Sequence, residues 1–145
     1  MRGATSMTGR FVLDISVVMA WCFAETSSGF AAAILDLLSD HQALVPAVWP
    51  LETTNALLVA ERRKRIPRAH ALRFLHLLNS LPISVEQDPI DLVFGENYVL
   101  AQAAGLSSYD ASYLALAIRE SVPLATLDDA LRKAARKFDV RIMEP

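Results

Sequence analysis

Short apolar runs alternate with longer stretches of helical periodicity along this chain, and the alternation limits the folds open to it. The stretches between the runs repeat alanine and leucine at helical spacing. Strands that alternate with helices favour right-handed crossovers and a parallel sheet, so the sequence predicts an α/β fold with a mostly parallel central sheet of about four to five strands flanked by helices. The expected strands lie at residues 11–14, 43–45, 83–85, 123–126 and 140–142.

Capping residues and helix breakers set the expected helix ends. Ser16 is a candidate cap for a first, short helix that reaches residue 21. Pro50 suits the first turn of a later helix, and Gly105 is placed to end another. Together these signals predict helices over residues 16–21, 29–38, 50–65, 67–79, 88–104, 108–120 and 128–137.

Length and composition favour one globular domain. The chain has 145 residues, of which 53% are hydrophobic and 21% charged, which argues against disorder. We expect the domain to span residues 10–145, after a loose leader at residues 1–9 that is rich in glycine, serine and threonine. A formal charge of −2 gives no general attraction to nucleic acid. Cys22 is the only cysteine, which excludes an intramolecular disulfide, and no 18-residue apolar run predicts a membrane span, so we expect a cytoplasmic protein.

Four acidic residues stand where an expected strand ends or an expected helix begins: Asp14, Glu52, Asp110 and Asp128. In an α/β fold such positions converge at the carboxyl edge of the sheet, where ligands bind. Two unit charges 4 Å apart repel by about 4 kcal/mol at an effective dielectric of 20, so converging carboxylates need a cation or shared protons. A Mg²⁺ or Mn²⁺ site is the simplest interpretation. Each acid taken alone could instead cap a helix or complement its dipole.

The segments around these acids resemble, in the same order and at similar intervals, the four acidic motifs of PIN-domain nucleases. The likeness extends over almost all of residues 10–143, and among PIN domains the compact form resembles the VapC toxins of bacterial toxin–antitoxin pairs. The four segments are residues 12–16 around Asp14, Glu52 with residues 55–57, residues 109–117 around Asp110, and residues 126–128 followed by Leu131.

The resemblance implies a metal-dependent endoribonuclease that leaves a 5′-phosphate and a 3′-hydroxyl. Asp14, Asp110 and Asp128 are the expected metal ligands, and Glu52 completes the catalytic set by holding a second position or orienting water. The adjacent Asp129 could take the place of Asp128, although the Thr-x-Asp spacing of the family selects Asp128. Four residues are expected to support these acids from the outer shell: Ser16, Asn55, Thr126 and Asp129.

The resemblance also implies partners, namely an RNA substrate such as transfer RNA, a VapB-like antitoxin and a second copy of the chain in a homodimer. The densest basic run could grip an RNA backbone, or it could simply be a solvated helix end. It consists of Arg62, Arg63, Lys64 and Arg65, with Arg68 close behind.

Three other functions compete with the toxin hypothesis. A housekeeping RNA-processing nuclease of the same fold fits the same motifs. A haloacid-dehalogenase-like phosphatase also begins with an aspartate after a strand, but it needs a second acid two residues later, where this chain has Ser16. A non-catalytic interaction module, whose acids only cap helices, should show no stabilisation by divalent metal.

Overall fold

A parallel four-stranded sheet forms the centre of the molecule in the computed structural model, which describes residues 9–23 and 29–144. The strands run in the order β3-β2-β1-β4, and every pair is parallel. This confirms the predicted fold class. The strands are β1 (Gly9–Leu13), β2 (His41–Pro46), β3 (Ile83–Glu86) and β4 (Leu124–Ala125).

The two central strands carry the core. Phe11, Val12 and Leu13 of β1 are fully buried, as are most residues of β2. Both faces of a parallel sheet are covered, so its strands are continuously apolar instead of alternating, and the sequence of β1 has this character. The register pairs Val12 with Leu44 on one side and with Leu124 on the other.

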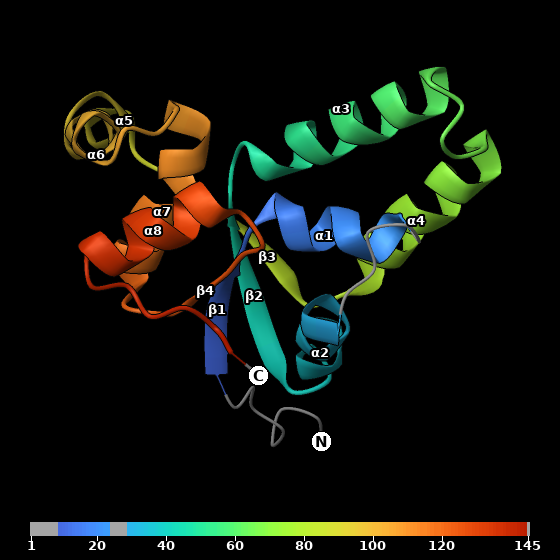
Figure 1. Cartoon of the computed structure of the whole chain (residues 1–145), viewed down its shortest axis with the longest axis horizontal. Coiled ribbons are helices and arrows are strands. Elements are labelled where there is room, and N and C mark those ends of the chain that lie inside the picture. The colour runs from blue at the N-terminus through green and yellow to red at the C-terminus, as the bar shows by residue number, and fades with distance from the viewer. Residues whose placement is uncertain (1–8, 24–28, 145) are drawn as a thin grey trace.

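Helices cover both faces of the sheet. Figure 1 shows α1 to α4 on one side of it and α7 with α8 on the other. Helices α5 and α6 pack against each other, and α6 packs on α7. The helices are α1 (Ile15–Cys22), α2 (Gly29–Leu37), α3 (Trp49–Arg62), α4 (Arg68–Ser80), α5 (Ile90–Phe94), α6 (Glu96–Ala104), α7 (Ser108–Glu120) and α8 (Asp129–Lys137).

Four local predictions need correction. The single helix expected over residues 88–104 is two helices that meet at Gly95, whose φ and ψ are −112° and −100°. A Cβ at Gly95 would lie 2.8 Å from the backbone oxygen of Asp91, so only glycine fits this break. Helix α3 ends at Arg62 and not at residue 65, because the chain turns through Lys64 at a φ of 59°.

The other two corrections concern a cap and a strand. Asp14, not Ser16, caps α1, since its side chain accepts the Ser16 backbone N–H. The strand expected at residues 140–142 is, within the described residues, only an isolated parallel bridge between Leu124 and Ile142. Of the leader predicted at residues 1–9, Gly9 begins β1 and residues 1–8 lie outside the described residues.

The strand order decides where a site can form. The chain leaves β1 toward β2 and β3 on one side, and it returns to the other side of β1 as β4. The gap beyond the carboxyl ends of β1 and β4 is therefore a topological switch point, the usual ligand crevice of an open α/β sheet. Within residues 9–23 and 29–144, no helix combines the length and apolarity needed to cross a bilayer.

Candidate active site

Asp14 follows β1 directly and lies at this switch point. Its side chain is buried, with only 2% of its surface exposed, and its backbone N–H donates to the Ala125 oxygen of β4 at 3.0 Å. Burial raises the pKa of Asp14, and the negative charge of Asp110 raises it further, while hydrogen bonds from Ser16 and Thr126 act in the opposite direction. The ionised form of the Asp14 carboxylate is therefore destabilised at this position.

Two hydroxyl groups hold Asp14 in one orientation. Ser16 Oγ donates to Asp14 Oδ2 at 2.6 Å, and Thr126 Oγ1 donates to the same oxygen at 2.8 Å. Each hydroxyl also accepts a backbone N–H from the β4–α8 connection, Leu127 to Ser16 at 2.9 Å and Asp128 to Thr126 at 3.0 Å. The two hydroxyls therefore connect the residues that follow β1 to the β4–α8 connection around Asp14. Among the described residues, all the hydrogen bonds to the Asp14 carboxylate go to Oδ2 and none to Oδ1.

Glu52 enters from the first turn of α3 and is held by a buried tyrosine. The hydroxyl of Tyr113 on α7 donates to Glu52 Oε1 at 2.6 Å. Burial raises the pKa of Glu52, and the charges of Asp14 and Asp110 raise it further. Burial and the negative charge of Glu52 also raise the pKa of Tyr113, so this phenol stays protonated and remains a donor.

The sequence motifs included Tyr113 without assigning it a role. It lies three residues after Asp110, and residues at that spacing share a helix face. That spacing is the signal that would have identified it beforehand.

Asp110 is in the first turn of α7, whose cap is Ser107. Ser107 Oγ accepts the Asp110 backbone N–H at 3.1 Å, so the Asp110 side chain is not used for capping. The pKa of Asp110 is raised by burial and then by the charge of Asp128. The charge of Asp110 acts on Asp14 and Glu52, and the charge of Asp128 acts on Asp110. These four acids therefore lie near one another at one edge of the sheet.

Asp128 caps α8 with a single oxygen. Its Oδ1 accepts the backbone N–H of Ala130 at 2.8 Å and that of Leu131 at 3.2 Å. The other carboxylate oxygen stays available to a ligand. Asp129 is exposed in the first turn of α8 and makes no hydrogen bond to the other acids within the described residues. The geometry thus connects Asp128, through Thr126, to Asp14 and leaves Asp129 outside.

Two other groups of expected site residues lie farther out. Asn55 is exposed on α3 and makes no hydrogen bond to Glu52 in the part of the chain that the structure describes. The basic run surrounds the turn from α3 to α4, at the end of the molecule away from α5 and α6 (Figure 1). Within that run, Arg65 stacks on the Phe23 ring at 4.1 Å, and both Arg63 and Arg65 line a groove that also contains Ser16 and Leu127.

Within the described residues, no basic side chain forms an ion pair with the four acids, Asp14, Glu52, Asp110 and Asp128. As placed, the side chains of residues 9–23 and 29–144 offer no group of three or more Asp, Glu, His or Cys close enough to hold a metal ion. The arrangement is a set of neighbouring carboxylates, and the pKa values of Asp14, Glu52 and Asp110 are raised.

Comparison with known families decides what this arrangement is. The family model described as "PIN domain" matches residues 11–137. The chain belongs to the PIN domain family. PIN domains are nucleases, and this confirms the resemblance drawn from the acidic motifs. No curated protein matches the sequence significantly.

Solved structures share the fold of this PIN domain. PAE2754 from Pyrobaculum aerophilum is 26% identical with a TM-score of 0.64, over 88% of this chain and 87% of that one. VapBC2 from Rickettsia felis, solved with a DNA fragment from its promoter, shares 14% identity with a TM-score of 0.66, over 92% of this chain and 97% of that one. FitAcB from Neisseria gonorrhoeae shares 20% identity with a TM-score of 0.61, over 93% and 97%. At 14% and 20% identity the likeness is one of fold.

Proposed function

We propose that this PIN domain is a divalent-metal-dependent endoribonuclease and the toxin of a VapBC-type toxin–antitoxin pair. The observation that carries the proposal is the buried Asp14 at the switch point, beside three further carboxylates and without a cationic partner in residues 9–23 and 29–144. Buried carboxylates that repel one another favour a site that functions with a bound cation.

The donor set fits Mg²⁺ or Mn²⁺. These ions prefer oxygen ligands, and Mg²⁺ is commonly held through one or two carboxylates and several waters, so three converging carboxylates are not required. We assign Asp14, Asp110 and Asp128 as the groups that hold the ion directly or through water. Asp14 Oδ1 and Asp128 Oδ2 are the oxygens that capping and hydroxyl contacts leave available. When bound, such an ion lowers the pKa of water and neutralises charge on the phosphate.

The protein groups then act as follows. Ser16 and Thr126 keep Asp14 oriented, and the Tyr113 hydroxyl keeps Glu52 in place. Glu52, with its raised pKa, is suited to accept a proton from the attacking water. The phosphodiester is hydrolysed with a 5′-phosphate and a 3′-hydroxyl as products, and Asp129 contributes no group to this step.

RNA contact is proposed at the groove that contains Ser16 and Leu127 near the acids. Arg63 and Arg65 line the same groove, which has a volume of about 470 Å³. Cationic contacts to phosphate supply affinity that does not depend on sequence. Arg62, Lys64 and Arg68 are exposed around the same turn and extend the basic surface. Transfer RNA is a candidate substrate, and an enzyme with cellular RNA as substrate would act in the cytoplasm.

Protein partners follow from the relatives. The Rickettsia felis and Neisseria gonorrhoeae structures are named as VapBC2 and FitAcB complexes. By analogy we propose a VapB-like antitoxin that covers apolar surface near the first helices and places an arginine among the uncompensated acids. A homodimer is proposed on the same basis, and light scattering of the purified chain tests it.

The decisive experiment is cleavage of total cellular RNA by the purified protein with Mg²⁺ or Mn²⁺. We expect discrete fragments with 5′-phosphate ends that disappear with EDTA and in Asp14→Asn. Asn also caps helices and can accept the two hydroxyl donors, so this variant should fold. Fragments of equal intensity from the wild type and from Asp14→Asn would contradict the assignment.

The interaction-module alternative has one observation in its favour, since Asp14 and Asp128 do cap helices. Thermal unfolding with Mn²⁺ separates the two functions. A ligand at 100 times its Kd stabilises the folded state by about 2.7 kcal/mol. We expect Mn²⁺ to raise the Tm of the wild type and not that of Asp110→Asn. An unchanged Tm in both would favour the module.

A further inference from the structure

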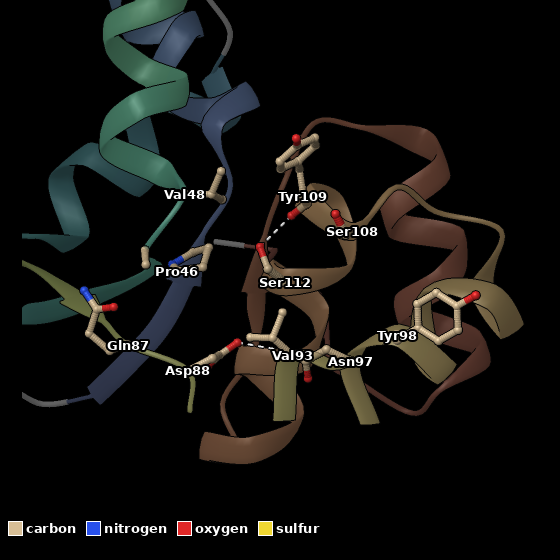
Figure 2. A pocket seen from close by; sticks show the side chains of 11 residues that line it. Pro46, Val48, Gln87, Asp88, Val93, Asn97, Tyr98, Ser108, Tyr109 and Ser112 are labelled. Atoms are coloured by element: carbon tan, nitrogen blue, oxygen red, sulfur yellow. Dashed lines mark hydrogen bonds between the residues drawn. The ribbon is translucent and has the colours of Figure 1, made fainter. Parts of the chain in front are cut away.

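A cavity of about 280 Å³ lies next to the acidic site. Figure 2 shows Pro46 and Val48 on one side of it and Ser108 with Ser112 on the other. Val93 contributes to its lining from α5. The cavity is thus enclosed by the β2–α3 turn, the first turns of α7 and the end of α5, and none of the acids discussed above lines it.

Two of the elements that form the cavity also carry acids of the site. Tyr109, which lines the cavity, immediately precedes Asp110 in α7. Val48, on the opposite side, accepts the backbone N–H of Glu52 at 3.0 Å. The cavity therefore adjoins the acidic site through these two elements.

Two tyrosine rings border the cavity without belonging to the core. Tyr109 is 60% exposed and Tyr98 is 59% exposed, whereas the tyrosine that serves the acids, Tyr113, is fully buried. Figure 2 shows both rings among the lining side chains, on separate parts of the wall. Exposed aromatic faces stack unpaired bases of single-stranded nucleic acid, independently of sequence.

Three polar groups on the wall of the cavity, Asp88, Asn97 and Ser112, offer acceptors, while Gln87 and Ser108 can also donate. Asp88 is held by Arg119, which compensates its charge, and by Asn97 Nδ2 at 2.8 Å. The Ser112 hydroxyl is donated to the Tyr109 carbonyl at 2.5 Å. Because one amide hydrogen of Asn97 and the Ser112 hydrogen are already used, the carboxylate of Asp88, the Asn97 amide oxygen and the Ser112 oxygen present lone pairs. Such a wall suits a ligand that carries amino groups.

We propose that this cavity receives one unpaired RNA base beside the bond that is cut, and that it prefers bases with an exocyclic amino group over uracil. The inference rests on the proposed ribonuclease function and extends it to a site for nucleotide preference. Its volume is just below the roughly 300–1,000 Å³ of pockets for drug-sized ligands, so it suits a single base and not a base pair.

Nucleoside binding tests the cavity without cleavage or metal. Adenosine, guanosine, cytidine and uridine are titrated separately into the metal-free full chain, and backbone amide NMR signals are followed. We expect the amino-bearing nucleosides to shift the signals of Ser108 and Ser112, and uridine to shift them less. Val93→Trp, which fills the cavity, should abolish the shifts, while the matched Val99→Trp on the exposed face of α6 should keep them. No shift with any nucleoside, or equal shifts in both variants, overturns the proposal.

Cleavage of a random single-stranded RNA pool tests the same cavity during catalysis. Tyr109→Ala should raise KM by about 5- to 150-fold, the equivalent of one lost stacking contact, while Tyr109→Phe retains the ring and stays near wild type. Val93→Trp should lose the nucleotide preference at the cut site. Cleavage with an unchanged preference in Val93→Trp overturns the base site and leaves the ribonuclease function standing. Nucleoside binding without any RNA cleavage overturns the ribonuclease function instead.

Discussion

The acidic edge of the sheet and the α5–α6 segment differ in burial and in the hydrogen bonds that hold them in place. At the acidic edge, Asp14 and Thr126 are 2% and 0% exposed, and each is tied by hydrogen bonds to a second loop. In α5 no residue is buried, and Phe94 is 76% exposed. The first region is fixed by long-range contacts, whereas the second is shaped by one local feature, Gly95.

This difference shows where charge can be concentrated. Uncompensated carboxylates raise the free energy of the folded state, so they persist only where the surrounding core holds them in place. Helix α5 carries one acid, Asp91, which is exposed. The same residue type is therefore a costly group in one region and an ordinary surface group in the other.

The largest effect on RNA cleavage is expected from a substitution of one of the four acids. Asp110→Asn should reduce RNA cleavage more than about 100-fold, because even the outer-shell partners of metal ligands are worth about 10- to 100-fold. Asp91→Asn, the same change in the first turn of α5, is the matched control and should cleave like the wild type. Circular dichroism checks that both variants fold. Equal activity of the two variants would contradict the proposed role of Asp110.

A smaller effect is expected from the residue that positions Glu52. Tyr113→Phe keeps the buried ring and removes the hydroxyl that donates to Glu52 Oε1 at 2.6 Å. We expect cleavage to fall about 10-fold, and the lower limb of its pH profile to move to higher pH because the pKa of Glu52 loses a contact that lowers it. Ser80→Ala, which removes an exposed hydroxyl at the end of α4, is the control. An unshifted profile in Tyr113→Phe would show that Tyr113 only packs.

The pH dependence of stability tests whether the acids at the edge of the sheet differ from the exposed acid of α5. In the folded, metal-free protein the pKa values of Asp14, Glu52 and Asp110 are raised above 3.8, 4.5 and 3.8, so the folded state binds more protons than the unfolded chain above those values. Their contribution to stability is complete below the unfolded values and is lost as the pH rises through the folded ones.

Urea unfolding in EDTA, at pH values that start at the unfolded value of 3.8 and increase from there, measures this loss. Asp14→Asn with Asp110→Asn should flatten the dependence, because both groups then cannot ionise. Asp91→Asn should leave it unchanged. If the stability of the wild type depended on pH in the same way as that of the double variant, the raised pKa values would be contradicted.

The smallest functional effect is expected in the α5–α6 segment. Gly95→Ala places a Cβ 2.8 Å from the Asp91 oxygen, a contact with backbone that cannot be relieved by a side-chain rotation. We expect a loss of about 1–3 kcal/mol in the free energy of unfolding and unchanged Mn²⁺ binding, since no acid of the site lies on α5 or α6. Gly29→Ala, where a Cβ meets nothing within 4 Å, is the control. Lost Mn²⁺ binding in a folded Gly95→Ala would show that the two regions are coupled.

The success of sequence-based prediction follows the same division. Helix α7 lies at its predicted bounds, and β1, β2 and β3 fall within a few residues of theirs. Burial on both faces leaves a strong apolar pattern in β1 and β2, whereas β3 is only partly buried. The α5–α6 break was missed because a single glycine inside a helical pattern is usually tolerated. The cap of α1 was misassigned because Ser16 and Asp14 are both good caps and only the structure shows which side chain accepts the N–H.

The sequence by itself determined the α/β class, the order of the acidic motifs and membership of the PIN family, because these depend on residue types and their spacing along the chain. Tertiary structure alone decided that Tyr113 holds Glu52, that Thr126 connects Asp14 to the backbone of Asp128, and that Asp129 is exposed. The reason is physical. These contacts join residues up to 112 positions apart, and their existence depends on how strands and helices pack and not on any local preference of the chain.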